Sequence, residues 1–483
     1  MMRKIALLGC GSLLLLPGSV LAETLQEALN SAYRNNPTLM VQRANVRATD
    51  ENVPIARAAG RPTIDGSAMY QENVLKGDQT GNLFTSDPDR QLVGQLSMNV
   101  PLISFGAVRN SVRAAEARSE ASRHGLRTTE SDLFSRVVAG YMDVLRDEAT
   151  VRLSQQNHKV IEYTLTQTRD RLDVGDAGPT DVAQAEARVA LAVSQKQTAE
   201  ARLIASRENY IRLVGNPPGD LAVPPPLPQM PATVEEAVRI ALDSNPALQS
   251  AQAENRAAKY DIRTADVEYM PRVSAVGGLN HYDYLGSLAA GTGPRNRDEG
   301  TTGYVGVQLK MPIYQGGRGA AQARQARQKY GMTLEQIAAA ERDVVADTRS
   351  TFANWKSTSN IIDAARSGVQ ANERALVGIR AEVNNGMRPL LDLLNAEQEL
   401  LNAQVTEVTA QRDAYVAGFA LLAAIGRAEA RNLNFDTALL YDPMVHYDDV
   451  RGRLTAIGDK TEYPEHIATG TATTPAQDAV IRP

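Results

Sequence analysis

Cysteine is almost absent from this chain of 483 residues, where Cys10 is the only one. It lies inside an N-terminal segment with two early basic residues, an apolar run from Ile5 to Leu16 and a small-residue site at Val20–Ala22. These three parts are typical of a secretory signal peptide, which we expect to span residues 1–22. Attachment of a lipid at Cys10 would leave residues 13–16 of the apolar run on the mature chain, so we favour cleavage after Ala22. The mature chain then has no disulfide and no thiol chemistry.

Aromatic residues are scarce as well, at 5% of the chain with one tryptophan. A large compact core needs more bulk than this, whereas long helices wetted on much of their surface do not. Removal of the signal peptide takes away two basic residues and leaves 49 basic against 56 acidic ones, a net charge of −7. A mildly acidic chain is a poor ligand for nucleic acid, so we expect no nucleic-acid partner. No later segment has 18 consecutive apolar residues, so no transmembrane helix is expected.

Catalytic motifs are missing from the sequence. It contains no glycine-rich phosphate loop with its lysine, no His-Glu-x-x-His and no cysteine pairs for zinc. The five histidines are scattered without spaced partners: His124, His158, His281, His446 and His466. We therefore predict that the chain is not an enzyme and has no cofactor and no metal site.

An internal repeat organises what the chain does contain. The segment TLQEALNSAYRNNPTL at 24–39 recurs as TVEEAVRIALDSNPAL at 233–248. The segment GDAGPTDVAQAEA at 175–187 recurs from Gly386, so that Asp181 matches Asp392 at a distance of 211 residues. The sequence predicts two structural repeats, 23–220 and 233–431, joined by a proline-rich linker. This linker is 221–232, and we expect 432–483 to form an equatorial segment and a disordered tail.

Each repeat is predicted to contain a helix, a strand hairpin, a very long helix, a turn and a shorter helix. The strand hairpin, the long helix and the shorter helix are expected at 61–101, 105–174 and 179–215 in the first repeat, and at 271–313, 316–385 and 389–426 in the second. A helix of this length would reach about 100 Å, which requires neighbours of similar length. Four residues mark the tip turns between the helices: Gly175, Pro179, Gly386 and Pro389. Apolar and alanine residues at 3–4 spacing after each turn predict a coiled-coil seam with closely packed backbones.

The hairpin segments alternate with the period of a strand. Leu92, Leu96 and Met98 lie on one face of the strand, and mostly polar residues lie on the other. In the second repeat Val305, Val307, Leu309 and Met311 share one face in the same way. Such segments fit strands that cross a bilayer with one apolar and one polar face. The alternative is a soluble two-stranded ribbon packed on the helices. Four strands are too few for a closed membrane barrel, so the membrane interpretation requires several chains to share one.

This arrangement resembles the TolC-like outer membrane efflux and secretion protein family. The most specific motifs are NVPLISFG at 99–106, its echo KMPIYQGG at 310–317, and the two tip turns. The resemblance implies a mixed fold, in which a homotrimer forms a 12-stranded outer-membrane β-barrel from four strands per chain and a long α-helical, coiled-coil tunnel in the periplasm. It also implies outer-membrane lipid, a periplasmic adaptor and an inner-membrane ABC or RND transporter as partners.

The resemblance also assigns roles to residues at the tips. Asp181 and Arg388 match the family's gate ion pair, whose tyrosine partner falls at Val383. Asp392 matches the first of two acidic positions that ring the entrance, and the second falls at Asn395. The resemblance therefore implies a periplasmic gate without its tyrosine and an entrance ring of three charges, not six.

Taken together, these features predict a passive outer-membrane exit duct of a tripartite export system. Type I protein secretion is the favoured pathway, because within the family the lack of a lipid anchor is associated with it. Multidrug efflux is the alternative, and a soluble periplasmic coiled-coil scaffold or adaptor is the alternative of another class.

Overall fold

The computed structural model describes residues 22–74, 88–227, 230–287, 298–433, 435 and 440–454. The predicted signal peptide up to residue 21, the centres of both strand-connecting loops and the predicted C-terminal tail from 455 lie outside the described residues.

The two halves of the chain contain nearly the same elements in the same order. The first half consists of α1 (Leu25–Asn35), α2 (Pro37–Asp50), α3 (Asn52–Ala58), β1 (Thr63–Glu72), β2 (Arg90–Ile103), α4 (Ala107–Asp173) and α5 (Pro179–Val214). The second consists of α6 (Val234–Ser244), α7 (Pro246–Asp266), β3 (Arg272–Asp283), β4 (Glu299–Lys310), α8 (Arg318–Asn384) and α9 (Leu390–Ala424), followed by α10 (Met444–Val450).

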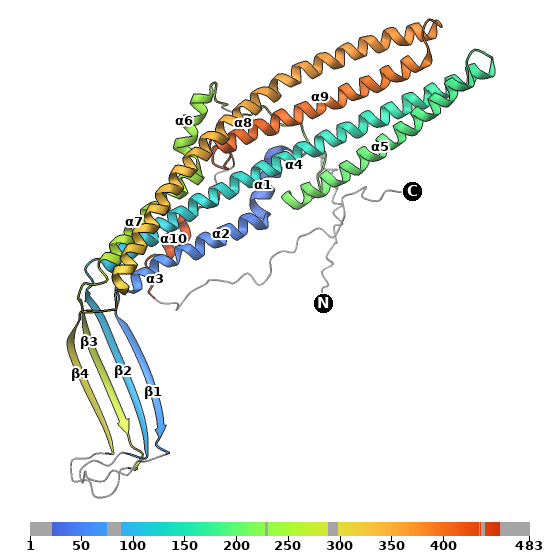
Figure 1. Cartoon of the computed structure of the whole chain (residues 1–483). Helices are drawn as coiled ribbons and strands as arrows, with labels where there is room; N and C mark the ends of the chain where they lie inside the picture. The colour runs from blue at the N-terminus through green and yellow to red at the C-terminus, as the bar shows by residue number, and fades with distance from the viewer. Residues whose placement is uncertain are drawn as a thin grey trace, which may run out of the picture.

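The molecule is elongated, with the helices at one end and the sheet at the other (Figure 1). The long helices α4 and α8 have 67 residues each, and each folds back through a turn into α5 or α9. The two hairpin turns lie at the end of the molecule opposite the strands (Figure 1). None of the helices in the described part of the chain combines the length and apolar character needed to cross a membrane.

Alanine brings the helices of each hairpin into contact. In α5 the buried alanines Ala185, Ala192 and Ala199 are spaced by seven residues, and α9 buries Ala410 and Ala417 at the same spacing. A seven-residue repeat keeps one stripe of a helix against its neighbour, and the small side chain lets the backbones approach closely. This is the predicted seam.

The Asn-Pro break near the start of each half fastens the hairpin to the rest of the structure. The side-chain oxygen of Asn36 accepts a hydrogen bond from the N–H of Thr38 and caps α2, while its Nδ2 donates to the carbonyl of Leu213 at 2.9 Å. Asn245 caps α7 in the same way and donates to the carbonyl of Ala424 at 2.9 Å. Each asparagine therefore satisfies orphan groups at two helix ends.

Two local features distinguish the halves. The first half has a second break at Glu51, between α2 and α3, and Pro54 of α3 lies in the first helical turn, where its missing N–H is tolerated. A capping box, in which the side chains of Thr24 and Glu27 each accept a hydrogen bond from the other residue's N–H, is complete at the start of the first half. At the equivalent Thr233, the carboxylate of Glu236 accepts from the N–H of Ala232 at 3.0 Å instead.

Glu23 is bound through all of its polar groups. Its N–H donates to the carbonyl of Asp220 at 2.7 Å, and its carbonyl accepts from Ala222 and from the hydroxyl of Tyr141. The buried Tyr210 donates from its hydroxyl to the Glu23 carboxylate at 2.7 Å. The first residue after the predicted cleavage site thus joins the start of the first half to the linker between the halves.

The few aromatic residues gather where the helices are most crowded. Phe134 of α4 stacks on Phe435 of the C-terminal segment at 5.3 Å between ring centroids, and Tyr33 of α1 packs against both. Aromatic pairs of this kind contribute beyond the area that they bury. The largest buried cluster of the described residues surrounds these three rings, and we call this region the waist. The hairpin arms beyond the waist depend on alanine and leucine for their packing.

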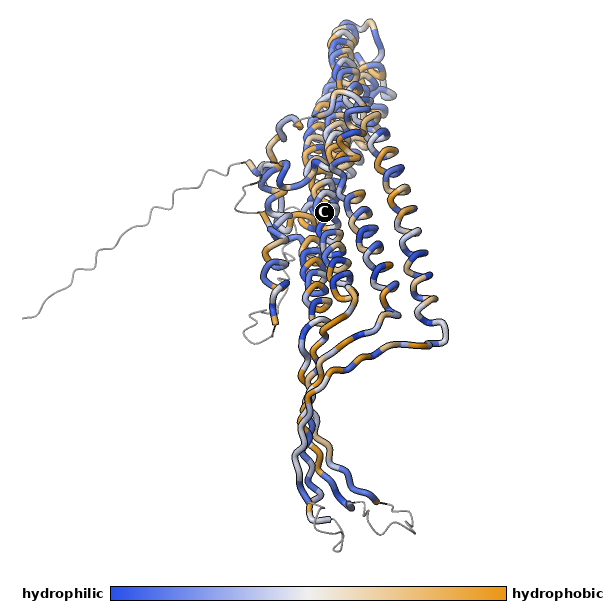
Figure 2. Tube along the Cα trace, turned by 90° about the vertical axis from the view of Figure 1, so that its left-hand side faces the viewer, coloured by the Kyte–Doolittle hydropathy of each residue, from blue (hydrophilic) through white to orange (hydrophobic). Residues whose placement is uncertain are grey.

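The four strands form one antiparallel sheet in the order β1-β2-β3-β4. The pairing of β2 with β3 joins the two halves, with Leu96 opposite Leu279 and Met98 opposite Gly277. Since directly paired residues share a face, the register places most of the apolar side chains of the four strands on one face. This face contains Ile64, Leu92, Leu96, Met98, Val100, Ala275, Leu279, Val305, Val307 and Leu309. The opposite face is mainly polar, and hydrophobic and hydrophilic residues alternate along the strands in Figure 2.

A buried carboxyl group in the waist binds a proton unusually tightly. Glu130 of α4 accepts a hydrogen bond from the N–H of Ala430 at 2.6 Å, and burial raises its pKa to about 7. The neighbouring Glu429 raises it further, while Arg43 opposes the shift.

The folded-state pKa of Glu130 exceeds its unfolded value, so folding stability should fall as the pH rises from about 4.5 to about 7. The loss should be about 3 kcal/mol, because one unit of pKa corresponds to about 1.4 kcal/mol. We predict that E130Q, which keeps an acceptor for Ala430 without the charge, flattens this dependence and is at least as stable as the parent above pH 7. Denaturant midpoints between pH 5 and pH 8.5 test this, with E373Q at an exposed position as the control. An unchanged slope in E130Q would contradict it.

Candidate functional site: the tips of the helical hairpins

Both tip turns use the same backbone device. Gly175 and Gly386 have φ angles of +80° and +70°, a left-handed conformation that glycine adopts without strain. Pro179 is the first residue of α5, whereas Pro389 caps α9 from the position before it. Pro389 was expected to be the first residue of the helix, but α9 begins one residue later at Leu390, so the two turns have the same length.

In the first turn, Asp181 binds its own backbone. Its carboxylate accepts a hydrogen bond from the N–H of Gly178 at 3.0 Å and lies in the first turn of α5. A carboxylate there is stabilised by the free N–H groups of the helix terminus. Across the turn, Arg171 pairs with Asp176 at 2.9 Å.

In the second turn, Arg388 binds two carboxylates of its own chain. Its Nε lies 2.5 Å from Glu382 at the end of α8, and its Nη1 lies 3.8 Å from Asp392. Arg388 therefore fastens the two sides of the turn to each other. The chain does not bring Arg388 to Asp181, and Glu382 takes part in a contact that the sequence had not suggested.

Val383 is buried between α8 and α9 with Leu376 and Leu393. This position, where the resemblance places a gate tyrosine, therefore contributes packing and offers no hydroxyl group.

Asn395 connects the two hairpins. Its side-chain oxygen accepts a hydrogen bond from Arg188 of α5, and Gln195 binds Gln398 a further turn along. The second entrance position therefore lies next to an arginine. Arg188 follows Asp181 by one heptad, and this spacing is the signal in the sequence that could have placed it on the same side of the helix.

Each hairpin has one further ion pair near its tip. In the first hairpin Arg169 pairs with Glu186, and in the second Arg380 pairs with Glu397. Both residues of the second pair follow their equivalents in the first pair by 211 residues. These pairs connect the two arms of each hairpin one or two turns from the tip.

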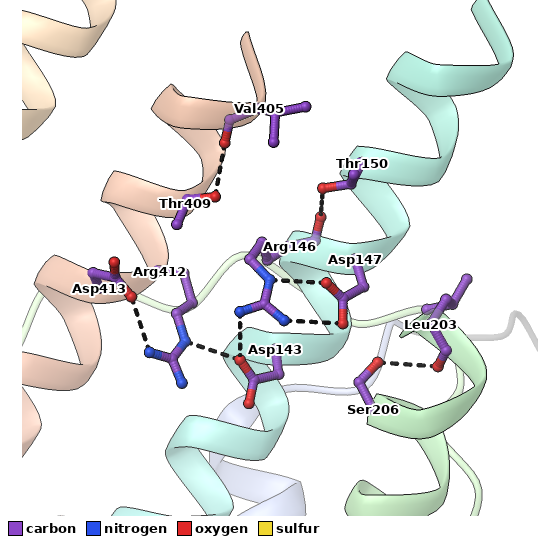
Figure 3. A network of polar contacts seen from close by, with 10 residues as sticks. All are labelled: Asp143, Arg146, Asp147, Thr150, Leu203, Ser206, Val405, Thr409, Arg412 and Asp413. Carbon is purple, nitrogen blue, oxygen red and sulfur yellow. Dashed lines mark hydrogen bonds and ion pairs between the residues drawn. The ribbon is translucent and has the colours of Figure 1, made fainter. Parts of the chain in front are cut away.

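Closer to the waist, a network of charges joins the two halves (Figure 3). Asp143 of α4 accepts from Arg146 at 3.0 Å and from Arg412 of α9 at 2.9 Å. Arg146 also binds Asp147, and Arg412 also binds Asp413. The shared carboxylate of Asp143 therefore connects the first hairpin to the second where most of each side chain is covered.

The sequence of the chain matches a known family. The model of the outer membrane efflux protein family matches residues 28–216 and 237–427, most of both halves. The chain belongs to this outer membrane efflux protein family. Outer-membrane location, a role in export and the absence of enzymatic activity follow from membership, as predicted, and the TolC-like resemblance is confirmed.

Curated relatives and solved structures cover nearly the whole chain. The outer membrane efflux protein BepC of Brucella suis is 32% identical over 90% of this chain and 92% of its own. The proteases secretion protein PrtF of Dickeya chrysanthemi is 27% identical over 84% of this chain and 89% of its own. The crystal structure of the Campylobacter jejuni CmeC outer membrane channel superposes with a TM-score of 0.73 at 17% identity, over 90% of both chains. The fold of this efflux protein family member is therefore that of a TolC-family channel.

Loss of the shared network should loosen the link between the halves. We predict that R412A lowers the free energy of unfolding by about 1–3 kcal/mol, because it leaves the covered carboxylate of Asp143 with one partner fewer. The control is R327A, which removes an exposed pair with Asp266 at 2.8 Å and should cost about 1 kcal/mol or less. Denaturant unfolding of the purified protein compares the two. Equal effects of R412A and R327A would show that the network contributes no more than an exposed ion pair.

Proposed function

We propose that three copies of this chain form one exit duct, which passes protein cargo of a type I secretion system from an inner-membrane transporter and its periplasmic adaptor to the exterior. The observation that carries the proposal is the sheet of four strands, with one apolar face and two outer strands that each pair on one side only.

Lipid does not tolerate open strand edges, because their N–H and C=O groups have no water to bind there. β1 and β4 leave such edges, and four strands fall well short of the minimum of about eight in a membrane barrel. Three copies, with β4 of one beside β1 of the next, close a barrel of twelve strands and leave no edge.

The helices support the same assembly. α4 and α8 are equally long, yet α4 buries 24 residues and α8 buries eight. Exposed apolar residues remain along α8, among them Met332, Leu334, Ile361 and Val377. An apolar surface of this kind usually contacts another protein. A neighbouring copy beside α8 would cover it and continue the tunnel below the barrel.

The tips are the proposed gate. Within one chain, Arg388 binds Glu382 and Asp392, and Asp181 holds the start of its own helix. In the closed trimer, Arg388 would also face Asp181 of a neighbouring copy, which extends the family's ion pair into a network with three carboxylates. Arg388 lies near Asp392 and partly neutralises its charge. The entrance ring should therefore attract cations less strongly than three unpaired carboxylates would.

Removal of the arginine should release this network. We predict that R388S raises the single-channel conductance of the purified protein in planar bilayers, because like charges at Glu382 and Asp392 then repel each other across an unsecured turn. R327S, which removes an exposed pair with Asp266 far from the tips, is the matched control. Conductance that stays the same in both variants would remove Arg388 from the gate.

The pathway is the finer part of the proposal. The names of the relatives point both ways, since BepC is named for efflux and PrtF for secretion of proteases. The predicted cleavage after Ala22, which would remove Cys10, supports secretion. The chain carries no nucleotide-binding motif, so the energy for export comes from the transporter.

Crosslinking at the tips identifies the pathway. The mature chain is free of cysteine if the predicted signal peptide is removed, so G178C and M387C each provide one reactive thiol at a tip. After crosslinking in cells, capture of the adaptor of an ABC exporter would support type I secretion. Capture of an adaptor of a proton-driven drug pump alone would replace it with multidrug efflux. The parent protein without cysteine is the control for unspecific capture.

A further inference from the structure

The two halves turn from strand to long helix through equivalent segments, and each turn contains two successive residues in a left-handed conformation. In the second half the turn uses Gly316 and Gly317, with φ angles of +58° and +80°. In the first half the equivalent residues are Phe105 and Gly106, with φ angles of +47° and +86°. A phenylalanine therefore holds the left-handed conformation that a glycine holds 211 residues later.

This conformation is unfavourable for phenylalanine. In a left-handed backbone the β-carbon lies too close to the following carbonyl oxygen, so the conformation is strained for any residue except glycine. Packing inside the chain does not compensate, because the side chain of Phe105 is 51% exposed. In water, both the backbone and the phenyl ring of this residue would be poorly placed.

The surroundings of Phe105 are apolar and exposed as well. The register of β2 against β3 shifts between Pro101 and Ile103, so that Ile103 pairs with Val273 and joins the apolar face of the sheet. In the second half, Ile313 is 92% exposed. Tyr314, next to it, is 88% exposed. Figure 2 shows this apolar stretch at the narrow neck between strands and helices.

Basic residues follow directly after the apolar ones. Arg109 of α4 and Arg318 of α8 lie in or beside the first turns of the long helices, and both are exposed. An aromatic and apolar band that ends in arginine is the order expected at a membrane surface, where rings lie at the headgroup level and guanidinium groups reach the phosphates.

We infer that Phe105, with Ile313 and Tyr314, is the anchor that fixes the chain at the periplasmic surface of the outer membrane, with its ring among the lipid headgroups and upper acyl chains. The occupant of this exposed band is lipid, because the band continues the apolar face of the sheet. Burial of the ring in lipid offsets the backbone strain, and the three-copy assembly carries three such rings. The inference rests on the proposed barrel, whose apolar face is in contact with lipid.

Fluorescence quenching by lipid tests this anchor. W355F removes the only tryptophan of the chain, and F105W then places one at the proposed anchor with an aromatic ring retained. V307W on the apolar face of β4 reports whether the sheet is inserted. Y163W, at an exposed site of α4 near the tip end, is the control outside lipid. Each full-length protein is reconstituted into phosphatidylcholine vesicles with bromine atoms on the acyl chains, close to the headgroup or deep in the bilayer.

We expect quenching of F105W and V307W to exceed that of Y163W by at least about twofold, with F105W quenched more by bromine near the headgroup and V307W more by deep bromine. Quenching of V307W without quenching of F105W would overturn the anchor and leave the barrel intact. Equal quenching of F105W by deep bromine and by bromine near the headgroup would also overturn it, since the ring would then lack a defined depth. Absence of quenching at V307W would instead overturn the inserted sheet, and the anchor with it.

Discussion

A helix of 67 residues is not stable by itself in water, and the rest of this structure depends on how α4 and α8 obtain neighbours. The solution is lateral contact through small residues. Alanines at seven-residue spacing bring α5 and α9 against the long helices, and the asparagines before Pro37 and Pro246 bind the ends of those shorter helices at the waist. The largest cluster of buried bulky side chains lies at the waist, where several elements meet. The low aromatic content is therefore a consequence of the architecture.

The sequence predicted the repeat, the helices, the strands and the two tip turns, because each depends on local periodicity or on a residue with unusual backbone freedom. Gly175 and Gly386 could be identified in this way, as could the alternation in β2 and β4. The extra break at Glu51 was missed because Pro54 in a first turn leaves little trace in the hydrophobic pattern.

Contacts between distant segments could not be read from the sequence. Asp143 and Arg412 belong to different halves, and only the packing of α4 against α9 makes them partners. The same holds for Arg188 and Asn395, and for the pairing of Arg388 with Glu382 in place of Asp181 within one chain. Family resemblance gave the positions of the tip residues, but the partners that each residue takes depend on side-chain geometry in three dimensions.

The pairing of β2 with β3 has a consequence for the order of events in the cell. Leu92 and Asp283 are neighbours in the sheet but lie 191 positions apart in the chain. The central ladder cannot form until α4, α5, the linker, α6 and α7 have all left the inner membrane, and contacts of such long range form slowly. Until then the first hairpin of strands exposes an apolar face and an unpaired edge to water, a state prone to aggregation. Insertion into the outer membrane must therefore come late, and the chain has to be shielded during its passage through the periplasm.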